Sequence, residues 1–198
     1  MELWGKCMYV VGFNGSARPE GNTAFFIEKA FEPLRAAGIE CEQVSLAGRV
    51  VRGCTACMSC RENGSGRCVF DDDIINECIE KMEKADAIII GSPVYFSDIT
   101  SETKALIDRS GYAIRGAGNF LSRKVGAGIA VARRAGTVHA LESINQFFFI
   151  NDMVVPGSSY WNMSLSRAVG DGEKDAEGIK TMLRLGENIA WLLKKLNN

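Results

Sequence analysis

The segment from Met8 to Thr23 constrains the fold of this chain more than any other part of the sequence. An apolar run, Met8 to Phe13, leads into a loop of Gly, Ser, Arg, Pro and Asn residues and then directly into an amphipathic helical pattern. The backbone N–H groups at the start of such a helix have no partners within it and lie at the positive end of its dipole. We therefore expect a phosphate to bind where the strand turns into the helix.

The loop also indicates which kind of phosphate fits. It contains no Gly-x4-Gly-Lys-Ser/Thr motif, and Gly12-Phe-Asn-Gly15 does not continue with the spacing of a dinucleotide fingerprint. A monophosphate fits better, although an ordinary capped turn remains the alternative because these residues favour turns for local reasons. The candidate donors are Ser16, Arg18, Asn22 and Thr23.

Length and composition favour one domain that spans residues 1–198. The chain has 198 residues and 46% hydrophobic content, enough for a substantial core. Its 23 basic and 24 acidic residues are spread along the chain, so neither nucleic acid nor an anionic membrane is an expected partner. The apolar run near the N-terminus is too short for a signal peptide or a membrane span, so we expect a cytoplasmic protein. Seven cysteines are then not expected to form disulfides.

Strand-like and helix-like segments alternate along the chain. The expected strands are Met8–Phe13, Ile39–Leu46, Ala87–Gly91, Val125–Ala132 and Met153–Val155. The expected helices cover Ile27–Leu34, Ile74–Met82, Thr103–Tyr112, Val138–Phe149 and Ile179–Leu196. This alternation predicts a five-stranded parallel sheet with helices on both faces, and right-handed crossovers favour the strand order 2-1-3-4-5.

In such a sheet a ligand binds at the carboxyl ends of the strands, near the point where the strand order reverses. The loop after the third strand, Gly91 to Thr100, carries Pro93, Tyr95 and Phe96. A flat ring system fits against this loop, with backbone groups of Pro93 to Phe96 facing its polar edge. The alternative is that the two aromatic rings only fill the core at the end of the strand.

Four segments taken together resemble one known group of proteins. They are Gly15–Thr23, the cysteine segment that ends in Cys68–Asp73, Ala85–Phe96 and Thr103–Arg109. In this order they resemble the NADPH-dependent FMN reductase and iron-sulfur flavoprotein group of the flavodoxin-like superfamily. The similarity runs from about Tyr9 to Val155 and implies a flavodoxin-like three-layer sandwich.

The resemblance implies FMN as the cofactor. Its 5'-phosphate is expected at Ser16, Arg18, Asn22 and Thr23, and its ring against Pro93, Val94, Tyr95 and Phe96. The loop after the fourth strand usually approaches the flavin in this family, and here it contains Arg133 and Arg134, of which at least one is expected to be an ordinary surface residue. The expected activity passes reducing equivalents from NAD(P)H through FMN to a small acceptor, a flavin or a quinone. Because FMN carries the redox chemistry, no protein group is expected to act as a catalytic acid or base.

Four cysteines form the pattern C-x2-C-x2-C-x7-C: Cys54, Cys57, Cys60 and Cys68. This spacing permits a 4Fe-4S cluster, as in the iron-sulfur flavoproteins that the chain resembles. Two alternatives stay open: cysteines that only pack the loop beside the flavin, as in relatives without a cluster, and a zinc site with four thiolates. With a cluster, the alternative function is electron transfer with ferredoxin or another redox protein. Cys7, Cys41 and Cys78 are interpreted as small buried hydrophobic residues.

Two aromatic segments, Phe147–Phe149 and Tyr160–Met163, lie outside the expected strands. Aromatic residues are enriched at interfaces, although packing in the core explains the first segment equally well. Relatives are usually dimers or tetramers with flavins near the subunit boundaries. We therefore expect a homodimer or homotetramer in which a partner closes the flavin site.

Overall fold

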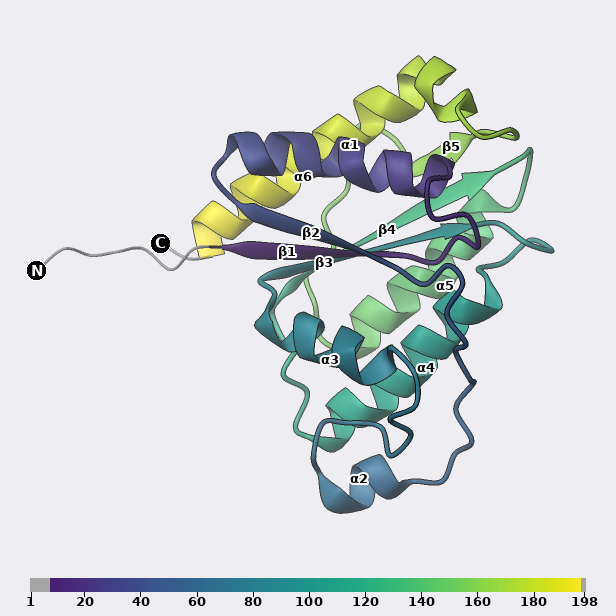
Figure 1. The fold of residues 1–198 in the computed structure, drawn as a ribbon. Helices are drawn as coiled ribbons and strands as arrows, with labels where there is room; N and C mark the ends of the chain where they lie inside the picture. The colour runs from purple at the N-terminus through teal and green to yellow at the C-terminus, as the bar shows by residue number, and fades with distance from the viewer. Residues whose placement is uncertain (1–7, 197–198) are drawn as a thin grey trace, which may run out of the picture.

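A computed structural model describes residues 8–196 and contains one five-stranded parallel sheet (Figure 1). Its strands are β1 (Tyr9–Asn14), β2 (Glu40–Ser45), β3 (Ala87–Pro93), β4 (Val125–Ala132) and β5 (Met163–Leu165). All four pairings are parallel, and the strands lie in the order β2-β1-β3-β4-β5. The predicted sheet order is confirmed.

Helices cover both faces of the sheet and form the outer two layers (Figure 1). One face carries α1 (Asn22–Ala36) and α6 (Ala176–Leu196), and the other carries α3 (Ile75–Lys84), α4 (Ser101–Gly116) and α5 (Thr137–Ile150). A short helix, α2 (Ser59–Asn63), lies outside α4, and a single 3-10 turn, η1 (Asp171–Lys174), precedes α6. The predicted three layers are therefore present.

The two cores follow from the two-residue period of a strand. In β3, Ile88 and Ile90 belong to the core under α3, α4 and α5, whereas Ile89 belongs to the core under α1 and α6. A strand that is apolar on both faces can be satisfied only between two helical layers. The apolar residues at helical spacing in α1, from Phe26 to Leu34, are buried against the second core.

The fifth strand lies later in the sequence than predicted. Within Met153–Val155 only Val154 pairs with β4, through one bridge to Val125, whereas β5 pairs with residues Ala130 to Ala132 at the other end of β4. Pro156, two residues after the bridge, has no N–H for the sheet, so the edge strand is interrupted there. As a result the loop that follows the sheet's last strand begins at Ser166.

Other expectations meet mixed outcomes. Phe147 and Phe148 are buried in the core, while Phe149 is exposed. Cys78 is buried and Cys41 half-buried, and Cys7 lies outside the described residues. Within residues 8–196 no helix is long and apolar enough to cross a membrane.

The contact between α1 and α6 depends on Gly186. A Cβ at this position would lie 2.1 Å from the carbonyl oxygen of Ala30, and a backbone atom cannot move aside cheaply. We expect Gly186→Ala to lower the free energy of unfolding by about 1–3 kcal/mol because it overpacks this contact. The matched control is Gly111→Ala in α4, where the new Cβ would lie 3.6 Å from Phe147. This control should gain about 0.5–1 kcal/mol from helix propensity. Urea unfolding measures both, and equal stability of the two variants would contradict the prediction.

Candidate functional site

Loops that follow β1, β3, β4 and β5 meet at the carboxyl end of the sheet and enclose a pocket of ≈ 180 Å³. It is lined by Ser16, Arg18, Gly21, Asn22, Thr23, Pro93, Val94, Tyr95, Val131, Arg133, Ser166 and Arg167. Every predicted cofactor-binding residue except Phe96 is on its surface. The strand-end position expected for a ligand is therefore hollow, with polar donors on one side and an apolar, backbone-rich loop on the other.

Local hydrogen bonds shape the loop between β1 and α1. The Asn14 side-chain oxygen accepts from the N–H of Ser16 at 3.0 Å, and the Ser16 hydroxyl oxygen accepts from the N–H of Arg18 at 3.0 Å. Helix α1 begins after Gly21 with no side-chain cap and no acidic residue in its first turn. The positive end of the α1 dipole thus faces the pocket without a negative group of its own helix to neutralise it.

Asn22 lines the pocket, but its side chain also fixes the loop after β5. Its Nδ2 donates to the carbonyl of Ala168 at 2.7 Å, and its Oδ1 accepts from the N–H groups of Gly170 and Gly172, both at 3.2 Å. The sequence suggested this amide as a phosphate donor. In the structure it holds the loop that carries Ser166 and Arg167 beside α1, and its contact with a phosphate stays a prediction.

The loop after β3 is anchored at its base and turns sharply at its tip. The N–H of Val94 donates to the carbonyl of Val131 at 2.8 Å, and Tyr95 and Asp98 exchange backbone hydrogen bonds of 2.9 and 3.1 Å. Phe96 and Ser97 at the tip have φ values of 49° and 66°, in the left-handed region, where non-glycine residues are strained. Tyr95 lines the pocket, whereas the Phe96 ring is fully exposed outside it. The turn thus directs the Phe96 side chain out of this pocket, and its contact with the ring stays a prediction.

The sequence did not reveal Ser166 and Arg167 as residues of this pocket. Both follow β5 (Met163–Leu165), whereas the sequence predicts the fifth strand at Met153–Val155, so the loop that contains them was not identified. Arg133 and Arg167 also border a second pocket of ≈ 440 Å³ between β5 and α6. Among the described residues neither guanidinium has a hydrogen bond or an ion pair, so both positive charges are free to meet a ligand.

The four cysteines of the C-x2-C-x2-C-x7-C motif line a separate pocket. Phe70, Arg109 and Tyr112 also contribute to its walls, and its volume is only ≈ 20 Å³. Cys54 and Cys57 are exposed, and Cys60 and Cys68 are partly buried. In the part of the chain that the structure describes, no three His, Cys, Asp or Glu side chains are close enough together to hold a metal ion. The fold gathers the thiols but leaves them short of a metal-binding geometry.

Helix α2 carries Cys60 and rests on α4. A Cβ on Gly116 would lie 2.7 Å from the carbonyl oxygen of Cys60, so only glycine allows this approach. The guanidinium of Arg61 lies 5.5 Å from the ring centre of Tyr112. These contacts explain why so short a helix has a fixed place on the molecule.

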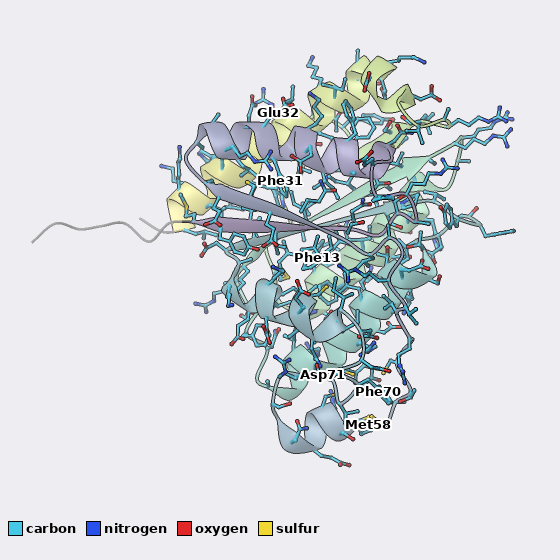
Figure 2. All side chains as sticks on the ribbon, in the orientation of Figure 1. Phe13, Phe31, Glu32, Met58, Phe70 and Asp71 are labelled. Carbon is cyan, nitrogen blue, oxygen red and sulfur yellow. The ribbon has the colours of Figure 1, made fainter. Side chains whose placement is uncertain are left out.

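Cys68 is held through its backbone by Asn76, which is buried in α3. The Asn76 side chain accepts from the N–H of Cys68 at 2.8 Å and donates to its carbonyl at 2.9 Å and to that of Phe70 at 3.3 Å. Phe70 and Met58 both line the cysteine pocket, and Figure 2 shows them near α2, at the end of the molecule opposite α1 and α6. Asn76 of α3 therefore fixes the backbone position of Cys68, the last cysteine of the motif.

Arg109 contacts the sulfur of the same cysteine. Its side chain is 1% exposed, and its Nε donates to the Sγ of Cys68 at 3.3 Å. It forms an ion pair with Asp73 and donates to the carbonyls of Arg52 at 3.2 Å and Phe70 at 3.0 Å. The sequence placed Arg109 in a motif without giving it a role. Its position on the apolar face of a helix was the feature of the sequence that could have indicated a buried, functional arginine.

The acidity of the cysteines reflects their proximity. Burial, followed by repulsion from the thiolates of Cys68, Cys57 and Cys54, raises the pKa of Cys60. Hydrogen bonds from the backbone and the side chain of Ser59 lower the pKa of the exposed Cys57. The sulfur of Cys60 thus interacts electrostatically with those of the other three cysteines.

Comparisons with known proteins agree with these features. The sequence profile of the family described as NADPH-dependent FMN reductase matches residues 8–167. An iron-sulfur flavoprotein of Methanocaldococcus jannaschii is 38% identical over 194 residues, which cover 94% of this chain and 98% of that protein. An iron-sulfur flavoprotein of Methanosarcina thermophila is 32% identical over 191 residues, 94% of this chain and 96% of that protein.

Among solved structures, a flavodoxin from the domain Archaea superposes with a TM-score of 0.61 at 14% identity, over 94% of this chain and 99% of that chain. This likeness shows the flavodoxin-like fold. Together with the match over residues 8–167, it means that the chain belongs to the NADPH-dependent FMN reductase family.

Proposed function

We propose that this protein is an iron-sulfur flavoprotein that exchanges electrons with a redox protein such as ferredoxin. In this proposal FMN binds in the pocket at the carboxyl end of the sheet, and a 4Fe-4S cluster is held by Cys54, Cys57, Cys60 and Cys68. The observation that carries it is the gathering of these four thiols in one pocket. The relatives named iron-sulfur flavoproteins, which align with 94% of the chain, support it.

The pocket at the sheet's edge suits FMN in its chemistry. Ser16, Arg18, Thr23 and the start of α1 offer donors for a phosphate, and Pro93 to Tyr95 offer an apolar surface with backbone polar groups. Its ≈ 180 Å³ is smaller than the roughly 300–1,000 Å³ typical of cofactor pockets, so the ring would extend beyond it. Exposed rings nearby, those of Tyr95 and Phe96, support a homodimer or homotetramer in which a second copy covers the flavin.

The cysteine pocket suits a cluster in the type and number of its ligands. Four thiolates are the usual ligand set of a 4Fe-4S cluster, and zinc sites more often use separated pairs. The ≈ 20 Å³ pocket is too small for the cluster, so the exposed loop with Cys54 and Cys57 has to move outward on loading. Ala56 and Met58 in this loop have φ values of 53° and 64°, a strained backbone that such a movement can relax.

In this proposal different residues would hold the cluster and supply positive charge to the flavin. When bound, FMN accepts one or two electrons and the cluster transfers one at a time. Asn76 and Arg109 hold Cys68, and α4 supports Cys60 through α2. Arg133 and Arg167 offer free positive charge beside the flavin pocket, where a reduced flavin or an anionic substrate needs it.

The free charge of Arg133 and Arg167 also favours a second candidate function. Two unpaired guanidiniums between adjoining pockets suit the phosphates of NAD(P)H. In that case FMN would be reduced directly, and electrons would pass to a small acceptor such as a flavin or a quinone. The cysteines would then only pack the loop.

The cluster is tested by substituting one exposed ligand. We expect about four irons and four sulfides per chain in protein purified or reconstituted without air. Cys57→Ser should lose most of this iron and keep its flavin, because Cys57 is exposed and its replacement disturbs no core packing. Cys41→Ser, in β2, is the matched control and should keep the iron. Iron and acid-labile sulfide assays measure this, and a wild-type protein without iron would contradict the cluster.

The phosphate site is tested by comparing FMN with riboflavin, which lacks the phosphate. Arg18→Ala should weaken FMN binding roughly tenfold, about 1.4 kcal/mol, because a charge-assisted hydrogen bond is lost. Riboflavin binding should not change, and Arg35→Ala at the far end of α1 should affect neither ligand. Flavin fluorescence titration gives the affinities. Equal losses for FMN and riboflavin would show that Arg18 does not contact the phosphate.

Anaerobic stopped-flow mixing separates the two candidate functions. We expect reduced ferredoxin to bleach the flavin absorbance rapidly in the wild-type protein and slowly in Cys57→Ser, whereas NADPH bleaches neither rapidly. Rapid bleaching by NADPH in both proteins, with no response to ferredoxin, would favour the NAD(P)H-dependent oxidoreductase.

A further inference from the structure

Arg109 is the largest fully buried side chain in the part of the chain that the structure describes. Its guanidinium keeps its charge at any physiological pH, and a buried charge is costly unless it is paired and hydrogen-bonded. Arg109 lies in α4 among buried apolar residues such as Leu106 and Ile114, so other groups must offset the free-energy cost of burying its charge. Asp73 supplies the charge partner, and the remaining donors indicate what the charge is placed to contact.

The donors of Arg109 fix its orientation on several sides. One terminal nitrogen pairs with Asp73 and donates to the Arg52 carbonyl, and the other donates to the Phe70 carbonyl. The Phe70 ring centre lies 6.0 Å from the guanidinium carbon. With these contacts in place, the Nε–H has one direction left, toward the Sγ of Cys68.

The backbone of Cys68 is also fixed, since the Asn76 side chain forms hydrogen bonds with both its N–H and its carbonyl. Cys54 and Cys57 are exposed and lie on a loop that contains left-handed residues. The cysteine site is therefore asymmetric. Its half around Cys68 is prepared by partly buried hydrogen bonds, and its half around Cys54 and Cys57 is exposed.

We infer that Arg109 is a positioning residue that raises the reduction potential of a cluster bound to Cys68, through its N–H···S hydrogen bond. Reduction adds negative charge to the cluster and its sulfurs, so a fixed donor stabilises the reduced form more than the oxidised form. Because Asp73 neutralises the charge of Arg109, most of the effect on the reduction potential comes from the N–H···S hydrogen bond and not from the net charge. The inference rests on the proposed cluster.

Two variants remove this hydrogen bond in different ways. Arg109→Lys keeps the positive charge beside Asp73 but lacks the fork that reaches the sulfur and both carbonyls. The double variant Asp73→Asn with Arg109→Met removes both charges and leaves no unpaired buried ion, which protects the fold. Arg52→Lys is the matched control, because Arg52 also lies over Phe70, 4.8 Å from its ring centre, and pairs with Asp72 without contacting a cysteine sulfur through its side chain.

The experiment is an anaerobic redox titration of each reconstituted protein, with the cluster followed by electron paramagnetic resonance and the flavin by absorbance. We expect the cluster midpoint to shift to a more negative potential in both variants, with the flavin midpoint unchanged and Arg52→Lys equal to the wild type. An unchanged cluster midpoint in either loaded variant overturns the inference, as does an equal shift of cluster and flavin. A wild-type protein that binds no iron overturns the proposed function together with the inference, and the iron assay on the same sample distinguishes that result.

Discussion

Burial of β1, β3 and β4 on both faces is the constraint on which the rest of this structure depends. Strands such as Val125–Ala132, which is buried along its whole length, cannot leave either face in water. Each crossover must therefore carry a helix, and parallel strands then end at the same edge of the sheet. The pocket lined by Ser16, Pro93 and Ser166 is a consequence of this arrangement, because loops far apart in the sequence meet at that edge.

Helix α4 connects the two candidate sites. At its start the Thr100 hydroxyl donates to the carbonyl of Gly15 at 2.8 Å, and the Thr100 N–H donates to the hydroxyl of Ser92 at 3.0 Å. These bonds tie α4 to the loop after β1 and to the end of β3. Farther along, Arg109 contacts Cys68, and Gly116 at the C-terminal end supports Cys60. One rigid element thus sets the position of the cysteine pocket relative to the pocket at the sheet's edge. Such a connection would hold the proposed flavin and cluster at a fixed separation.

The sites differ in how fully they are prepared. The loop between β1 and α1 is shaped by its own hydrogen bonds, and Asn22 locks it to the loop after β5. The cysteine pocket is prepared around Cys68 by Asn76 and around Cys60 by the contact of α2 with α4, whereas Cys54 and Cys57 are exposed. A half-prepared site reconciles four suitable ligands with the lack of a metal-binding arrangement within residues 8–196. It leaves the exposed half free to move outward, as the proposed cluster requires.

The sequence by itself determined the parallel sheet, its order, the phosphate-type loop and the four-cysteine motif. These features depend on local signals: two-residue and helical periods, turn residues, and spacing within one segment. Only the tertiary structure decided the place of β5, whose three residues form a half-exposed edge strand without a continuous apolar run. It also decided that Phe96 turns away from the pocket, that Ser166 and Arg167 enter it, and that Arg109 reaches Cys68 across 41 positions of the chain. Such contacts depend on the distances between separate elements, which packing sets and no local pattern records.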